Sequence, residues 1–237
     1  MKKVLKILIK CIGILFVLST VTFAILYAIY NKPLPQGKSG IAADSFARKM
    51  LKALNYEAYK DTRYVEWSFK EGKHRYKWDK QLGVARVEWD DYRVVLNLAN
   101  PAKSSVFEND IQVTENSRTE LIKTAVSNFN NDSFWLVAPF KVFDSGTERS
   151  LVTLEDGSDG LLITYTSGGT TPGDSYLWKL GKNRIPESFQ MWVEIIPIGG
   201  LEATWGDWQV MESGVFLPIC HKLGPMDFKM EDVKAYN

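Results

Sequence analysis

The first thirty residues constrain this chain more than any other part of it. Four lysines, Lys2, Lys3, Lys6 and Lys10, precede twenty uncharged residues, Cys11–Tyr30. As an α-helix, at about 1.5 Å per residue, this stretch is about 30 Å long, which matches the hydrocarbon core of a bilayer. The rest of the chain is polar and rich in aromatic residues. We therefore predict that its working part is delivered to a membrane or across one.

An uncleaved anchor and a signal peptide both fit residues 1–30. The nearest match to a cleavage site is Thr22-Phe23-Ala24, and a cut after Ala24 would leave an apolar overhang, residues 25–30. The apolar run is also longer than the core of a signal peptide. Tyr27 and Tyr30 suit a helix end at the lipid–water interface. We favour a membrane anchor through residues 11–30, with secretion to the periplasm after cleavage as the alternative.

The distribution of lysines predicts the orientation of this anchor. Four lysines lie in the ten residues before the apolar run, whereas only Lys32 and Lys38 lie in the ten after it. Positive charge favours the cytoplasmic side. The prediction is a single-pass protein of the bacterial inner membrane, with its N-terminus in the cytoplasm and its main domain in the periplasm.

Composition limits the classes of partner. Without the four lysines of the anchor, the chain carries 25 basic and 28 acidic residues, so it has no basic surplus. Nucleic acid is therefore not an expected partner. Cys11 lies in the anchor and Cys220 is alone outside it, so no intramolecular disulfide is expected.

The order of elements beyond the anchor can be read from hydrophobic periodicity. Residues 31–40 form a linker rich in Pro and Gly, and apolar residues at helical spacing predict a helix over about 42–59. Strict alternation then predicts a meander of strands between residues 63 and 98. Tryptophans recur there at an interval of eleven residues, the length of one strand and one turn. A second helix is predicted over about 116–128, with a cap at Asn116 or Ser117.

The second half of the chain reads as more strands. The apolar segment Phe134–Val142 is predicted to be a buried strand or a re-entrant loop, and six strands follow between residues 150 and 223. Residues 224–237 are expected to form a loosely docked tail. The predicted fold is therefore α+β and mainly β: a large curved antiparallel sheet, or incomplete barrel, over residues 41–223, with two or more helices on its concave face.

No arrangement of catalytic residues is legible in the sequence. The only histidines, His74 and His221, have no carboxylate at triad spacing and are expected at strand edges. Cys220 and His221 are neighbours, so in a strand they point to opposite faces and would not share a metal. The glycine-rich loop Ser167–Asp174 lacks the Gly-Lys-Ser/Thr of a phosphate cradle. We expect no enzyme, no metal and no cofactor.

The surplus of aromatic residues has two explanations, a packed β core or an apolar cavity that takes a ligand. The second explanation predicts a cavity lined by some of eight residues, Trp67, Trp78, Trp89, Trp135, Phe140, Tyr176, Trp178 and Trp192.

Four segments resemble the lipoprotein-carrier superfamily, the LolA/LolB/RseB-like group and in particular its Bacteroidetes-type members. They are Asp132–Asp144 (DSFWLVAPFKVFD), Gly160–Tyr165, Gly173–Tyr176 and Asp207–Pro218 (DWQVMESGVFLP). The resemblance covers about residues 41–223. It implies an incomplete β-barrel closed by helices, a cavity for acyl chains of lipids or lipoproteins, and no cofactor. The anchor is a departure, because a lipoprotein shuttle must be soluble.

Two functions follow from these observations. The first is a tethered periplasmic module that binds lipid or lipoprotein acyl chains. The second is a cell-envelope interaction or sensor module that binds another protein through a sheet edge or an aromatic surface. An enzyme acting on a membrane-linked glycan or lipid is the third and least supported reading, since no acid–base pair is legible.

Overall fold

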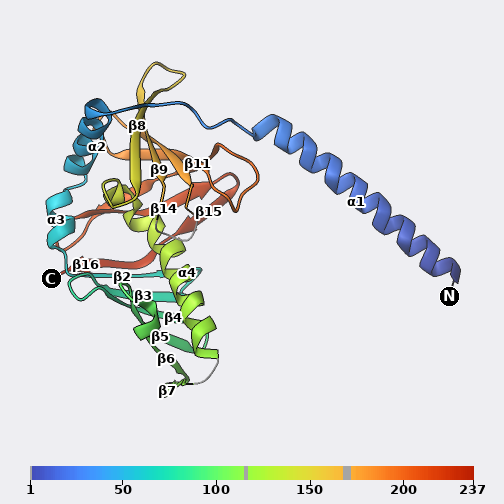
Figure 1. The fold of residues 1–237 in the computed structure, drawn as a ribbon, viewed down its shortest axis with the longest axis horizontal. Helices are drawn as coiled ribbons and strands as arrows, with labels where there is room; N and C mark the ends of the chain where they lie inside the picture. The colour runs from blue at the N-terminus through green and yellow to red at the C-terminus, as the bar shows by residue number, and fades with distance from the viewer. Residues whose placement is uncertain (1, 115–116, 168–171) are drawn as a thin grey trace.

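The computed structural model describes residues 2–114, 117–167 and 172–237. A long N-terminal helix is followed by a domain of two antiparallel sheets and further helices (Figure 1). This confirms an α+β, mainly β chain behind one apolar helix. The helices are α1 (Lys2–Tyr30), α2 (Ile41–Ala53), α3 (Tyr56–Asp61) and α4 (Ser117–Val137), with the 3-10 helices η1 (Pro101–Lys103) and η2 (Ala138–Lys141).

Helix α1 is long and apolar enough over Lys3–Tyr30 to cross a membrane. It projects from the domain (Figure 1). Its side chains are exposed from Lys3 to Tyr30. By length and composition it fits a single-pass anchor and equally a signal sequence.

The first sheet has seven strands, and its order follows the predicted meander. Trp67, Trp78 and Trp89 lie on three successive strands, so their interval of eleven residues is the repeat of a hairpin. The order is β16 (Glu231–Tyr236), β2 (Tyr64–Phe69), β3 (His74–Asp79), β4 (Val84–Trp89), β5 (Tyr92–Asn97), β6 (Ser105–Glu108) and β7 (Ile111–Gln112).

The second sheet has nine strands and contains the second half of the chain. All its pairings are antiparallel, and a bulge lies between β10 and β11 at Lys179 and Leu180. Its order is β1 (Lys38–Ser39), β8 (Thr147–Thr153), β9 (Asp159–Tyr165), β10 (Ser175–Leu180), β11 (Pro186–Trp192), β12 (Leu201–Thr204), β14 (Phe216–Leu223) and β13 (Gly206–Val210), with β15 (Met226–Lys229) paired to β14.

Helix α4 connects the two sheets. It packs against β4, β5 and β6 of the first sheet and against β14 of the second. Its inner face carries Ile122, Ala125, Phe129 and Leu136, which join one continuous apolar core. The described strands form two separate sheets and no closed barrel.

Helix α4 is longer than the sequence predicted. It continues to Val137, inside the segment that was expected to be a strand or a loop, and η2, which contains Pro139, follows it. Within this extension Asp132 is buried and hydrogen bonded to the first sheet. The proposed capping residue Asn116 lies outside the described residues.

The C-terminal residues also differ from the prediction. Strand β15 pairs with β14, and β16 pairs with β2, so the segment expected to be a loose tail belongs to both sheets. Met230 between these strands is buried in the core and donates its backbone N–H to Ile219. Few residues of β15 and β16 are buried, so the local sequence carries little of the apolar alternation that marks a strand.

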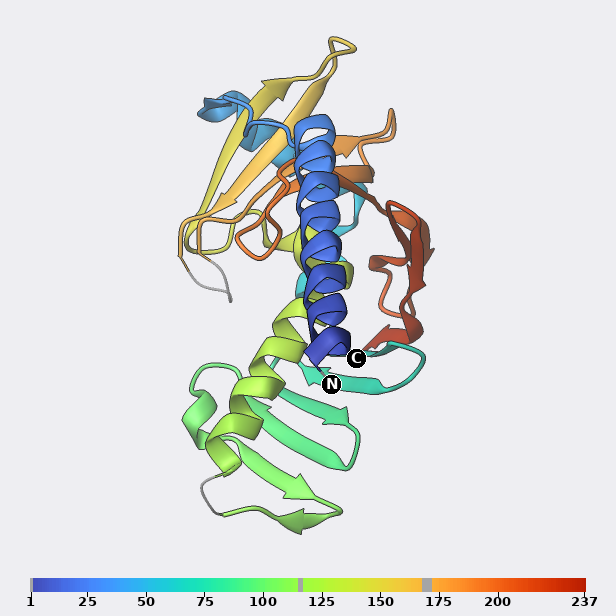
Figure 2. The ribbon, with the colours of Figure 1, turned by 90° about the vertical axis from the view of Figure 1, so that its right-hand side faces the viewer.

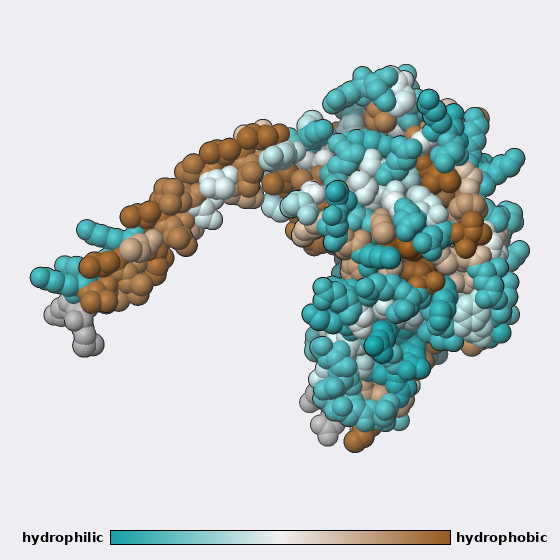
Figure 3. Space-filling model, turned by 180° about the vertical axis from the view of Figure 1, so that it is seen from behind, coloured by the Kyte–Doolittle hydropathy of each residue, from teal (hydrophilic) through white to brown (hydrophobic). Residues whose placement is uncertain are grey.

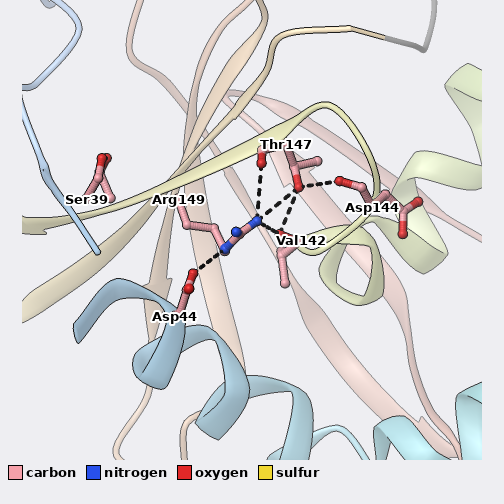
Figure 4. Close-up of polar contacts among 7 residues, drawn as sticks. Ser39, Asp44, Val142, Asp144, Thr147 and Arg149 are labelled. Atoms are coloured by element: carbon pink, nitrogen blue, oxygen red, sulfur yellow. Dashed lines mark hydrogen bonds and ion pairs between the residues drawn. The ribbon is translucent and has the colours of Figure 1, made fainter. Parts of the chain in front are cut away.

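Arg149 fixes α2 to the second sheet (Figure 4). Its Nε donates to Asp44 Oδ1 of α2 at 2.6 Å, and its Nη1 donates to the carbonyl oxygen of Val142 at 2.8 Å. Its guanidinium also lies over the Phe143 ring, 4.3 Å from the centroid. One side chain thus links α2, the segment after α4 and strand β8.

We predict that Arg149→Met lowers the free energy of unfolding by about 1–2 kcal/mol, because the charge-assisted hydrogen bonds to Asp44, Val142 and Thr147 at a partly buried site are lost. Urea unfolding of the full chain in mild detergent measures this. The matched control is Arg86→Met, whose exposed ion pair with Glu88 should contribute little. Equal effects of the two changes would contradict the prediction.

Candidate functional site

A groove of about 930 Å³ opens between the turn that joins β2 to β3 and the β14–β15 hairpin. In Figure 2 the red hairpin stands beside the teal turn. The groove combines aromatic and apolar side chains with charged ones. Its lining residues are Phe69, Lys70, Glu71, Lys73, Thr204, Gly206, Cys220, His221, Lys222, Asp227, Phe228, Lys229 and Glu231.

The local sequence explains the shape of the two walls. The β2–β3 turn holds three successive residues at positive φ, Lys70, Glu71 and Gly72, which reverse the chain sharply. The hairpin opposite turns at Gly224, also at positive φ. This geometry brings two phenylalanines, Phe69 at the end of β2 and Phe228 on β15, edge to face with ring centroids 5.9 Å apart.

His221 lies on the wall of the groove and is only 3% exposed. Its Nδ1 lies 3.2 Å from the carbonyl oxygen of Thr204, to which it donates, and its ring lies about 5 Å from those of Trp135, Trp205 and Phe228. Burial lowers its pKa to about 4, although the backbone carbonyls of Thr204 and Trp135 partly oppose this shift. The imidazole is therefore neutral at pH 7.

Cys220, the neighbour of His221, is a half-buried thiol at the groove. Burial raises its pKa, and the carboxylate of Asp207, 3.8 Å from its Sγ, raises it further. A thiol with a raised pKa is a weak nucleophile. The described residues contain no group of three His, Cys, Asp or Glu side chains that could hold a metal.

The rim of the groove carries four lysines and three carboxylates. Lys222 pairs with Asp227 at 3.4 Å. Lys70, Lys73 and Lys229 have no carboxylate within ion-pair distance in the part of the chain that the structure describes. The groove therefore has an aromatic floor and a rim on which four lysines outnumber three carboxylates, a net charge of +1.

A buried polar cluster of His74, Asp132 and Tyr76 stands behind this groove. Asp132 Oδ2 lies 2.7 Å from His74 Nδ1 and 2.5 Å from the Tyr76 hydroxyl, which both donate to it. Burial, together with the adjacent Asp132 carboxylate, raises the pKa of Tyr76 well above its ordinary value, so the phenol stays protonated. His74 pairs in register with Phe69 of the groove, and strand partners share a face.

This cluster was not predicted from the sequence. Both histidines were expected at strand edges without a carboxylate, whereas His74 contacts Asp132, a residue 58 positions away. The signal was present in α4, because Asp132 precedes Trp135 by three residues and so shares its inner face. The ring of Trp135 packs against that of the groove residue Phe228, with centroids 4.6 Å apart. Adjacent turns of α4 thus support the polar cluster and the groove.

Three of the eight predicted lining residues meet beside the groove. Trp135, Tyr176 and Trp178 surround Phe134, with ring centroids 4.8–6.5 Å from it. Only Trp135 reaches the wall of the groove, through Phe228.

The other five predicted residues lie in separate parts of the core. None of the eight is among the residues that line the groove, and their role in ligand binding remains a prediction. Trp67 and Trp78 pack around Phe129, Trp89 packs on Tyr92, Phe140 stacks on Tyr59, and Trp192 joins a small cluster with Val152, Leu162 and Leu177.

Several of these tryptophans carry buried N–H groups without an acceptor. The Nε1 atoms of Trp67, Trp78, Trp178 and Trp205 are buried and donate to no atom of the described residues. Buried indoles usually find a partner, because an unmade hydrogen bond costs about 1–3 kcal/mol. The aromatic interior thus leaves more hydrogen-bond donors unpaired than an ordinary core does.

No protein-family model matches this chain, and a search of curated proteins finds no match either. The function is therefore argued from the geometry of the groove.

Proposed function

We propose that this chain is a membrane-tethered periplasmic binding module whose groove takes the acyl chain of an anionic lipid or lipoprotein. The observation that carries the proposal is the groove itself, with Phe69 and Phe228 on its floor and Lys70, Lys73 and Lys229 on its rim. An amphiphile with a negative headgroup complements both parts. The groove residues replace the eight aromatic residues as the primary binding site.

The size and composition of the groove support this ligand class. A volume of about 930 Å³ falls at the upper end of ordinary ligand sites. Apolar surface supplies most of the free energy of such binding, since each buried methylene contributes about 0.8 kcal/mol. The lysines would add charge attraction at the mouth, where anionic headgroups lie.

The anchor and the order of elements suit a tethered binding module. A helix precedes the first meander, α4 joins it to a second meander, and α4 contacts both sheets. A module held at the inner membrane by α1 would receive its ligand from the bilayer or pass it on there. The unpartnered indole N–H groups near Trp135 offer donors for ester or amide carbonyls if a ligand extends inward.

The first experiment is native mass spectrometry of the full chain purified from bacterial membranes in mild detergent, followed by organic extraction. Recovery of phospholipid or acylated peptide in a defined ratio to protein supports the proposal. A protein that stays empty with added phosphatidylglycerol overturns it. The protein-interaction module would then become the better reading.

We predict that Phe228→Ser lowers the affinity for a phosphatidylglycerol labelled on its acyl chain about tenfold, because part of the aromatic floor of the groove is lost. Fluorescence titration of the full chain measures this affinity. The control is Leu82→Ser in the β3–β4 turn, where an apolar side chain is 66% exposed and is not among the residues that line the groove. Equal affinities of the two variants would place the ligand elsewhere.

The charge of the rim is tested separately. The triple variant Lys70→Glu, Lys73→Glu and Lys229→Glu should weaken binding of the anionic lipid more than that of a zwitterionic phosphatidylcholine with the same label. The triple variant Lys52→Glu, Lys103→Glu and Lys182→Glu, at exposed lysines outside the groove, provides the control for net charge. Equal losses for both lipids would contradict recognition of the headgroup.

A further inference from the structure

The end of α1 is attached to the domain through one loop, Val193–Gly200, which joins β11 to β12. Lys32 donates its backbone N–H to the Gly199 carbonyl oxygen at 2.9 Å, and Gly199 donates its own to Asn31 Oδ1 at 2.9 Å. Trp192 Nε1 donates to the Lys32 carbonyl oxygen at 2.8 Å. In Figure 1 the orange loop beside β11 lies next to the end of α1.

Close packing makes this attachment specific. A Cβ at Gly199 would lie 2.5 Å from the Trp192 ring, and a Cβ at Gly200, which has a φ of +78°, would lie 2.7 Å from Lys32 Cβ. Only glycine fits both positions. The loop is therefore fixed against Asn31 and Lys32, the two residues that follow Tyr30 at the end of the apolar helix.

The attached loop is apolar where it faces outward. Its sequence is VEIIPIGG, and Ile195 is 76% exposed. Leu34 in the linker is 47% exposed, and Tyr27 and Tyr30 at the end of α1 are exposed as well. Figure 3 shows the hydrophobic surface of α1 continuing to the point where the helix meets the domain.

We propose that the Val193–Gly200 loop is a second membrane contact, which inserts Ile195 into the interfacial region of the bilayer beside the end of α1. An exposed isoleucine at a loop tip gains free energy by leaving water, and a tryptophan and tyrosines beside it suit the interface. Glu194, the one charge of the loop, is exposed and would stay at the headgroup level.

The occupant of this surface follows from continuity with the anchor. A helix that crosses the bilayer ends at the lipid–water interface, and the loop is hydrogen bonded to the two residues after that end. The bilayer is thus the apolar medium nearest to Ile195. The inference rests on the membrane-anchor part of the proposed function and is independent of ligand binding in the groove.

The test places an environment-sensitive fluorophore at single cysteines of the full chain in vesicles of phosphatidylethanolamine and phosphatidylglycerol. The background is Cys11→Ser and Cys220→Ser, and the labelled positions are Ile195→Cys, Phe16→Cys in the anchor and Leu82→Cys in the exposed β3–β4 turn. Vesicles with a nitroxide near the headgroup or deep in the acyl chains report depth.

The expected result is a blue-shifted emission at position 195 that is quenched by the shallow nitroxide, with position 16 quenched by the deep one and position 82 by neither. If the label at position 16 is quenched but the label at position 195 behaves like the one at position 82, the loop contact is overturned. The anchor would still stand. Absence of quenching at 16 would overturn the anchor, and the loop contact with it.

Discussion

Replacing Asp132 with alanine is expected to lower the free energy of unfolding by about 3–5 kcal/mol. The carboxylate is 3% exposed and accepts hydrogen bonds from both His74 and Tyr76. Its removal takes the shared acceptor from the Tyr76 hydroxyl and from His74 Nδ1, which lie 3.2 Å apart, and leaves a void beneath α4. Since a domain is stable by only about 5–15 kcal/mol, this one change would take a large share of the total.

Urea unfolding of the full chain in mild detergent, followed by tryptophan fluorescence, measures the loss. Asp227→Ala is the control, because its carboxylate is exposed and pairs with Lys222 at a looser 3.4 Å. Asp132→Asn keeps one acceptor oxygen and should lose less than the alanine variant. A loss below about 1 kcal/mol for Asp132→Ala would mean that the cluster does not hold α4 to the sheet.

Adding Tyr76→Phe to Asp132→Ala tests the physical cause. The double variant no longer buries an unpaired hydroxyl, so it should be less destabilised than the sum of the single changes predicts. Strict additivity would show that the loss comes from the void alone.

The parts of the fold that rest on period-two alternation could be predicted from the sequence. The strands around Trp67, Trp78 and Trp89 begin and end close to the predicted positions, because one face of each is buried and the other wet. The apolar helix at the N-terminus follows from length and composition alone.

The parts of the fold that depend on contacts between residues distant in sequence could not be predicted. Strand β16 has a pattern of half-buried edge residues, and only its pairing with β2, more than 160 residues away, makes it a strand. Helix α4 continues through polar residues because Asp132 finds its partners on β3. The groove likewise arises from two turns, at Gly72 and Gly224, whose proximity no local pattern encodes.

His221 should make the protein less stable as the pH falls below neutral. Its pKa is about 4 in the folded chain and about 6.5 when unfolded, so between these values the unfolded chain binds the proton more readily. Stability from this group is therefore present above pH 6.5 and is lost as the pH falls toward 4. The loss between pH 7 and pH 5 should be about 2 kcal/mol, and it should approach about 3 kcal/mol at pH 4.

The variant His221→Asn isolates this contribution, because asparagine does not titrate and retains a donor for the Thr204 carbonyl. At pH 7 it should be less stable than the parent, since the ring contacts with Trp135, Trp205 and Phe228 are lost. Between pH 7 and pH 5 the difference should shrink by about 2 kcal/mol, because only the parent carries the unfavourable protonation.

The choice of window keeps other groups out of this measurement. The carboxylates whose pKa is lowered by their partners, Glu66 beside Lys77 and Glu202 beside Lys179, lose their contribution at lower pH and do so equally in both proteins. A difference between parent and variant that stays constant from pH 7 to pH 5 would show that His221 is protonated without cost. The wall of the groove would then be open to water, and a ligand there would meet a hydrated imidazole rather than a dry aromatic surface.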